Sequence, residues 1–96
     1  MKTIKIGPTV VPIVVHEKAC SSFEILGECS TIPHPEIRLR ALSTPFEYIT
    51  LLHECIHLIS DFYDLNLSEA QVRALDQGIS MLLKDNPKLL KGMLGE

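Results

Sequence analysis

The second half of the chain contains two long stretches whose apolar residues follow the helical repeat. In the first stretch, Thr44, Pro45 and Glu47 form a capping box with proline at the first helical position, which specifies where the helix begins. Its apolar residues form two seams, so we expect a sheet on one side and a second helix on the other. The seams are Ile49, Leu52, Ile56, Ile59 and Tyr63, and Leu51, Cys55, Leu58 and Phe62.

A second helix is predicted shortly after the first. It begins with the capping box Ser68-Glu69-Ala70-Gln71, and Leu67 and Val72 have the spacing of a hydrophobic staple. We expect this helix to run to about Lys84 and to fold back on the first helix. The positions predicted to face inward are Val72, Leu75, Ile79, Leu82 and Leu83.

Two further features concern the C-terminal part. Gly78 lies inside the second predicted helix, where glycine costs about 1 kcal/mol relative to alanine, so we expect close approach of another helix there. Pro87 ends that helix, and residues 88–94 predict a last short helix.

The first half of the chain is rich in β-branched residues and predicts strands. Thr3–Ile6 and Val10–His16 flank a Gly-Pro-Thr turn. Pro12 lacks the N–H group that a ladder needs, so its strand is expected at a sheet edge or bulged. Phe23–Cys29 is a further candidate, broken by a glycine, and Glu36–Leu42 alternates as a strand with one solvent-exposed face does.

These elements predict an α+β fold. We expect a small N-terminal antiparallel sheet of three to four strands, a two-helix hairpin and a short C-terminal helix, all in one domain of residues 1–96. A chain of this length buries roughly 60–65% of its unfolded surface. A substrate site on it should therefore be a shallow groove.

Composition excludes several classes of protein. The net charge is −3, and the scattered basic residues offer no patch for phosphates, so nucleic acid is not expected as a partner. The chain lacks a signal-peptide core and any run near eighteen apolar residues, so we expect a cytoplasmic protein without a membrane partner. Cys20, Cys29 and Cys55 show no C-x-x-C spacing and are predicted to be free thiols.

The first helix carries the pattern H-E-x-x-H. His53 and His57 lie one turn apart on one face, so their rings can converge on one ion. Glu54 points about 100° away around the axis and can act as general base on a zinc-held water without ligating the metal. The alternative is an accidental motif, because the same residues belong to the polar stripe that any surface helix keeps.

A catalytic zinc usually takes three protein ligands, so a third is needed. Counting outward from the turn between the helices places Asp76 opposite Cys55, between the two histidines, and leaves Glu69 nearer the turn. Helices cross at an angle, however, and a glutamate reaches further than an aspartate. The count leaves both acids as candidates.

Three stretches together form a recognisable pattern: L-L-H-E-C-I-H-L-I at 51–59, S-E-A-Q-V-R-A-L at 68–75 and L-L-K-D-N-P at 82–87. This pattern resembles small zinc metallopeptidases of the gluzincin type found in phages and mobile elements, which are distantly like the ImmA/IrrE family. In that family a glutamate that opens the second helix, followed by small or apolar residues three and six positions later, completes the site.

The resemblance implies a minimal zincin-like fold in which His53, His57 and Glu69 bind Zn²⁺ and Glu54 is the catalytic base. Two features depart from the family pattern. Glu69 follows His57 by only twelve residues, and Asp76 stands where the family usually has a small residue.

The predicted function is therefore zinc-dependent hydrolysis of a protein or peptide, with His34, Tyr48 or Tyr63 as the oxyanion donor. The alternative is a non-catalytic metal-binding regulatory or protein-interaction module of phage or mobile-element origin. Such a module would act through its sheet edge or its C-terminal Leu89-Leu90 and Met93-Leu94 pairs. A shallow groove would also suit a homo-oligomer.

Overall fold

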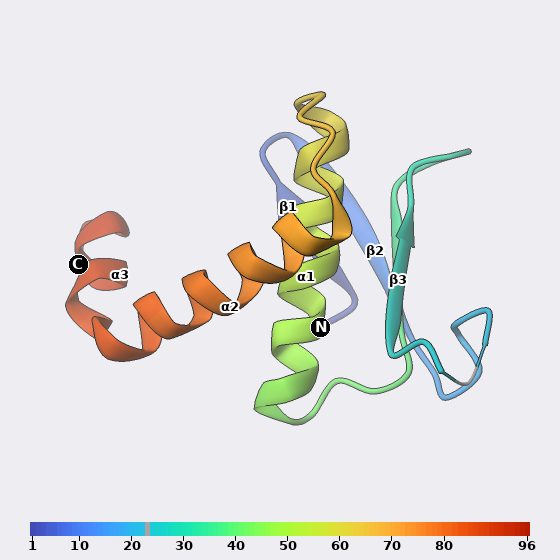
Figure 1. Ribbon diagram of the computed structural model, residues 1–96, viewed down its shortest axis with the longest axis horizontal. Coiled ribbons are helices and arrows are strands. Elements are labelled where there is room, and N and C mark those ends of the chain that lie inside the picture. The colour runs from blue at the N-terminus through green and yellow to red at the C-terminus, as the bar shows by residue number, and fades with distance from the viewer. Residues whose placement is uncertain (23) are drawn as a thin grey trace.

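The computed structural model describes residues 1–22 and 24–96 and confirms the α+β class (Figure 1). A four-stranded sheet is followed by a two-helix hairpin and a short third helix, as expected. Phe23, part of one expected strand, lies outside the described residues. The elements are β1 (Thr3–Ile6), β2 (Thr9–Val15), β3 (Gly27–Ser30), β4 (Glu36–Leu39), α1 (Pro45–Phe62), α2 (Glu69–Asp85) and α3 (Pro87–Met93).

The sheet is mixed, with strand order β1-β2-β4-β3. The β1–β2 and β3–β4 pairs are antiparallel, as expected, whereas β2 and β4 pair in parallel, with Ile13 opposite Ile37. This arrangement places β3 on the far side of β4 from β2, and β3 then turns back into β4. As a result β3 is an edge strand, although it is third in sequence.

Pro12 occupies the point where β2 changes partners. Residues 9–12 pair with β1, and the ladder to β4 begins one residue later at Ile13. The missing N–H group of Pro12 therefore interrupts no ladder to β4. The expected edge position of this strand was wrong, because β2 lies inside the sheet.

The hydrophobic core lies between α1 and one face of the sheet. Burying one aliphatic side chain of this core contributes about 1.5–3 kcal/mol, so the contact between α1 and the sheet is strongly stabilising. Cys55, expected as a small core residue, is buried among them. The core residues are Val11, Ile13, Ile37, Leu39, Leu51, Cys55 and Leu58.

A short loop sets the position of α2 on α1. The hydroxyl of Ser60 accepts a hydrogen bond from the backbone N–H of Leu67 at 2.9 Å. Asp64 and Asn66 adopt left-handed backbone conformations, with φ of 54° and 55°, which these two residue types tolerate better than most. Both predicted capping boxes are present, so the ends of the helices at this hairpin are well defined.

Only the first half of α2 packs against the body, and the helix then projects away with α3 at its end (Figure 1). Val72 is fully buried, but Leu75 and Leu82 are 42% and 49% exposed, so their predicted inward positions were wrong. Apart from its two chain neighbours and the nearby backbone of α2, no described atom lies within 4 Å of a Cβ built on Gly78, which contradicts the close approach expected there. Among the described residues, no helix is long and apolar enough to cross a membrane.

Candidate metal centre

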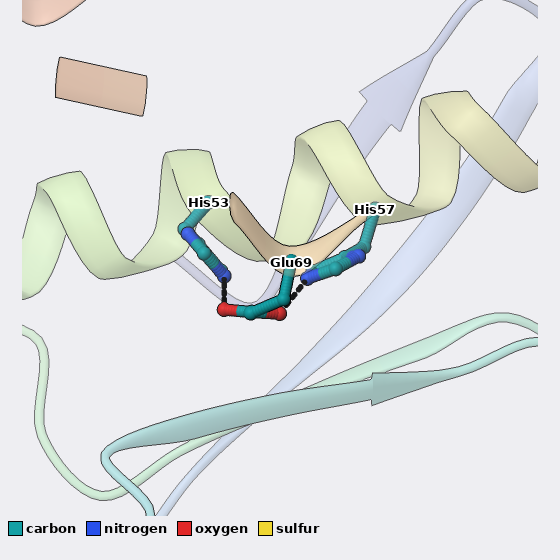
Figure 2. Close-up of side chains that lie close together, drawn as sticks. All are labelled: His53, His57 and Glu69. Carbon is teal, nitrogen blue, oxygen red and sulfur yellow. Dashed lines mark hydrogen bonds and ion pairs between the residues drawn. The ribbon is translucent and has the colours of Figure 1, made fainter. Parts of the chain in front are cut away.

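Three side chains from the two long helices converge on one point (Figure 2). Nε2 of His53 lies 2.8 Å from Oε1 of Glu69, and Nε2 of His57 lies 2.8 Å from Oε2 of the same carboxylate. One nitrogen or oxygen atom from each residue falls within 4.8 Å of the others. A single carboxylate therefore bridges two imidazoles.

Local structure determines how these groups meet. The i, i+4 spacing on α1 brings the two rings to a centroid distance of 4.9 Å, with an interplanar angle of 72°. Glu69 is the first residue of α2, directly after the N-cap Ser68. The loop and the cap therefore determine where its carboxylate lies relative to the histidines. The triad thus depends on the hairpin turn as much as on the motif.

Asp76 occupies a different place from Glu69. Its Oδ2 atom lies 2.5 Å from Nδ1 of His53, on the other side of the ring, and the residue is only 5% exposed. A carboxylate that accepts a hydrogen bond at Nδ1 fixes the orientation of the ring, so Nε2 of His53 points toward the triad. The residue count about the turn failed here, because α2 crosses α1 at a steep angle instead of running alongside it (Figure 1).

Glu54 lies beside the triad and takes no part in its hydrogen bonds. It is buried, and this burial raises the pKa of its carboxyl group. Strand β3 approaches it closely, since a Cβ built on Gly27 would lie 3.5 Å from Cγ of Glu54. Sequence reasoning missed this approach of β3 to Glu54, although a glycine inside an expected strand was a usable signal.

Glu69 is held in its charged form. Partial burial acts to raise its pKa, but the hydrogen bond from His57 and the nearby charge of His53 outweigh burial, so the pKa is lowered. The guanidinium of Arg73 adds a further contact, with Nη2 at 3.5 Å from Oε1. The triad therefore contains an ionised carboxylate, the form in which a metal ligand binds.

Two shallow grooves lie beside the triad, and both are lined by residues of β3, α1 and α2. One has a volume of about 560 Å³ and an apolar wall that includes Leu26, Phe46 and Ile49. The other, of about 460 Å³, extends past Cys29 to Asp61. Residues 53, 54 and 69 line both grooves, so the site is open to solvent along the strand edge.

The expected oxyanion donors do not reach this site. Among the described residues that line the two grooves, none is His34, Tyr48 or Tyr63. Tyr48 is 49% exposed, and Tyr63 lines a separate pocket with Phe62. A cationic group that does line the larger groove is Arg73.

The residues present fit a divalent cation. Two imidazoles and one carboxylate are a ligand set that catalytic zinc sites use, and nitrogen and oxygen donors also suit other transition metals. Each Nε2 atom lies at hydrogen-bond distance from an oxygen of Glu69, and a cation bound between them would be held by these same nitrogen and oxygen atoms. Asp76 supplies the carboxylate that commonly orients a ligating histidine.

Comparison with known proteins adds no further identification. No protein-family model, no curated protein and no solved structure matches this chain. The resemblance to gluzincins therefore stays a prediction, and functional inference depends on the geometry of His53, His57, Glu69 and their neighbours.

Proposed function

We propose that this chain is a zinc-dependent peptidase in which His53, His57 and Glu69 hold the metal and Glu54 is the general base. One observation supports this above all others. The third acid comes from a different helix, yet its two oxygens lie 2.8 Å from the two Nε2 atoms of the H-E-x-x-H motif. An accidental motif on a polar helix face gives no reason for such convergence.

The chain's own residues supply the remaining chemistry. A bound zinc would supply a Lewis acid that polarises the peptide carbonyl and lowers the pKa of water to about 7. Glu54 accepts the proton of the attacking water and then delivers it to the leaving amine. Burial raises the pKa of Glu54, which suits a group that must both take up and release a proton near neutral pH.

The edge strand β3 provides a place for an extended substrate. It borders both grooves, and its outer edge is free of another strand in the described sheet. A peptide can bind there as an added strand through main-chain hydrogen bonds, which depend little on its sequence. The apolar wall of Leu26, Phe46 and Ile49 favours an apolar side chain next to the cleaved bond.

The test combines an analysis of the bound metal with replacement of the proposed general base Glu54. Protein purified without added zinc is analysed for its metal content and incubated with a library of unstructured peptides, in which new termini are detected by mass spectrometry. We expect about one metal ion per chain. We also expect the rate to fall by roughly 10²–10⁴ in Glu54→Gln with the metal content retained, and to be unchanged in the exposed control Glu17→Gln.

Two results would refute the proposal. One is a chain that binds no stoichiometric metal under these conditions. The other is hydrolysis that Glu54→Gln leaves unchanged, because the cleavage would then come from another protein or another site.

A second candidate function is that of a non-catalytic interaction module. The exposed apolar side chains of α3 and of the residue that follows it favour this function. Leu89, Leu90, Met93 and Leu94 on and after α3 are 40–71% exposed, an arrangement that partner contacts would explain. If a second copy of the chain is the partner, Leu89→Lys with Leu90→Lys should abolish self-association in light scattering, while Glu54→Gln leaves it intact. A monomer at all concentrations would exclude this form of the candidate.

A further inference from the structure

Two exposed apolar side chains lie beside the triad. Leu26, which directly precedes β3, and Phe46, in the first turn of α1, line the larger groove and are 49% and 61% exposed. The partly buried Ile49 lines the same groove. An apolar group of a ligand that covers this wall removes it from water, which is favourable.

Arg73 lines the same groove from α2. Its Nη2 atom lies 3.5 Å from Oε1 of Glu69, and Nε2 of His53 lies 2.8 Å from the same oxygen. A single oxygen atom therefore separates the guanidinium group from the candidate metal centre. A ligand group that binds to Arg73 would lie close to the bond that the proposed function cleaves.

The contact with Glu69 leaves most donors of the guanidinium group available. Among residues 1–22 and 24–96 it is the only ion pair of Arg73, and it involves one nitrogen atom. Arginine has five N–H donors in a planar fork that matches the two oxygens of a carboxylate. The side chains of Arg73 and Glu69 are 62% and 55% exposed, and so exposed a pair contributes little to stability. The guanidinium group can therefore bind a second carboxylate.

The two grooves differ in charge. Arg73 is the only lysine or arginine among the described residues that line the larger groove, whereas those that line the smaller groove include neither, but do include Asp61. In the larger groove, Glu69 and Asp76 contact the histidines, and the carboxylate of Glu24 is exposed to solvent, which screens it. An anionic group of a ligand is therefore favoured on the Arg73 side of the triad and disfavoured on the other side.

The short edge of β3 gives a further reason for an anchor of this kind. β3 has only 4 residues, so an added peptide strand forms few main-chain hydrogen bonds with it. Tight binding of a short peptide then needs contacts outside the strand edge. A carboxylate held by Arg73 and an apolar side chain against Phe46 supply two such contacts.

We propose that Arg73 is a specificity-determining residue that binds a carboxylate group of the substrate, together with the amide of Gln77, which lines the groove one turn further along α2. The apolar wall receives a neighbouring side chain. The proposal rests on the proposed function and names its substrate class, namely peptides with a carboxylate close to the cleaved bond. This carboxylate is either the C-terminal one or that of an acidic side chain, because both offer the same two oxygens.

The test measures peptide binding to a chain whose proposed base has been removed. Five dansylated tetrapeptides that begin with Gly-Ala-Phe are titrated into Glu54→Gln at saturating zinc, and the Kd is obtained from fluorescence. One peptide ends in leucine with a free carboxylate and one in leucine amide, and the other three end in the amides of glutamate, glutamine and lysine. We expect a peptide with a carboxylate to bind roughly tenfold more tightly than its neutral counterpart.

The five peptides also distinguish the two sources of the carboxylate. A preference for the free leucine peptide over its amide identifies the C-terminal carboxylate. A preference for the glutamate amide over the glutamine amide identifies an acidic side chain.

Variants of Arg73 in the same background test whether this residue causes the preference. We expect the preference to vanish in Arg73→Gln and to become intermediate in Arg73→Lys, which keeps the charge but loses the planar fork. The leucine amide should bind within about twofold throughout. Lys84→Gln is the matched control, because Lys84 is an exposed cation on the same helix outside both grooves, and it should keep the full preference.

Four results would overturn the proposal. The first is equal binding, or no binding, of the charged and neutral peptides, and the second is a preference that Arg73→Gln retains. The third is tighter binding of the lysine amide than of the glutamine amide, because the acids of the groove would then determine its preference. The fourth is an equal loss for all five peptides in Arg73→Gln, because Arg73 would then contact only a group that every peptide shares.

The failure of this proposal can be distinguished from the failure of the proposed function. A chain that hydrolyses peptides but shows no preference for a carboxylate keeps the proposed function and overturns the role of Arg73. A preference that depends on Arg73 in a chain that hydrolyses no peptide refutes the proposed function, while the carboxylate site stands.

Discussion

Replacing Asp76 tests the separate roles of Asp76 and Glu69 beside the two histidines. Asp76→Ala removes the carboxylate that lies 2.5 Å from Nδ1 of His53, without touching any of the three groups that face each other in the triad. A charge-assisted hydrogen bond of this kind contributes about 1.5–3 kcal/mol, and the 5% exposure of Asp76 means that little solvent screens it. Loss of such a partner typically weakens metal binding about 10- to 100-fold, or about 1.4–2.8 kcal/mol.

The assay is a competition between the chain and a chromophoric zinc chelator at fixed pH. We expect Asp76→Ala to raise the Kd for zinc about 10- to 100-fold, and Glu69→Ala to raise it further because a direct ligand is lost. Asp85→Asn, an exposed acid at the end of the same helix, serves as control and should leave the Kd unchanged. Urea unfolding of the metal-free variants checks that each chain is folded before its affinity is compared.

Two outcomes would refute the reasoning about Asp76. A Kd within twofold of wild type would show that the contact with His53 does not influence the metal. A loss in Asp76→Ala greater than in Glu69→Ala would show that Asp76, and not Glu69, is the third ligand.

Three predictions concern stability, each measured by urea unfolding. Gly27→Ala should lower the free energy of unfolding by about 1–3 kcal/mol, because the new Cβ would lie 2.9 Å from Cδ2 of the buried Leu39; an unchanged value would show that β3 can shift freely. Gly78→Ala, which meets no described atom within 4 Å, should instead raise it by about 0.5–1 kcal/mol, and a loss would reveal a contact of α2. Ser60→Ala should lower it by about 1–2 kcal/mol, because the N–H group of Leu67 loses its acceptor; a neutral result would mean that water replaces the hydroxyl.

Much of the local structure could be predicted from the sequence, because its causes are local. The capping residues Thr44 and Ser68 and the stop at Pro87 act within a few positions of themselves. The starts of α1 and α2 and the end of α2 therefore followed from local sequence. The same is true of His53 and His57, whose convergence is a property of one helical turn.

The sequence could not predict which partners those elements would meet. The parallel pairing of β2 with β4, the exposure of Leu75 and Leu82 and the open surroundings of Gly78 all depend on where the chain goes between elements. Periodicity identifies an apolar face, but it does not say which other element packs on that face. In the second half of α2, Leu82 is 49% exposed, whereas Ile79 and Leu83 are partly buried.

In the candidate site, too, some features follow from the sequence and others only from the tertiary structure. The sequence alone determined the two histidines, the glutamate between them and an acid at the start of the next helix, because each follows from i, i+4 spacing or from a capping box. Only the tertiary structure decided that Glu69 faces both rings, that Asp76 lies behind His53 and that Gly27 of β3 lies beside Glu54. Those contacts depend on the angle at which α2 crosses α1 and on how closely β3 approaches it, and both are set by packing between residues far apart in the chain.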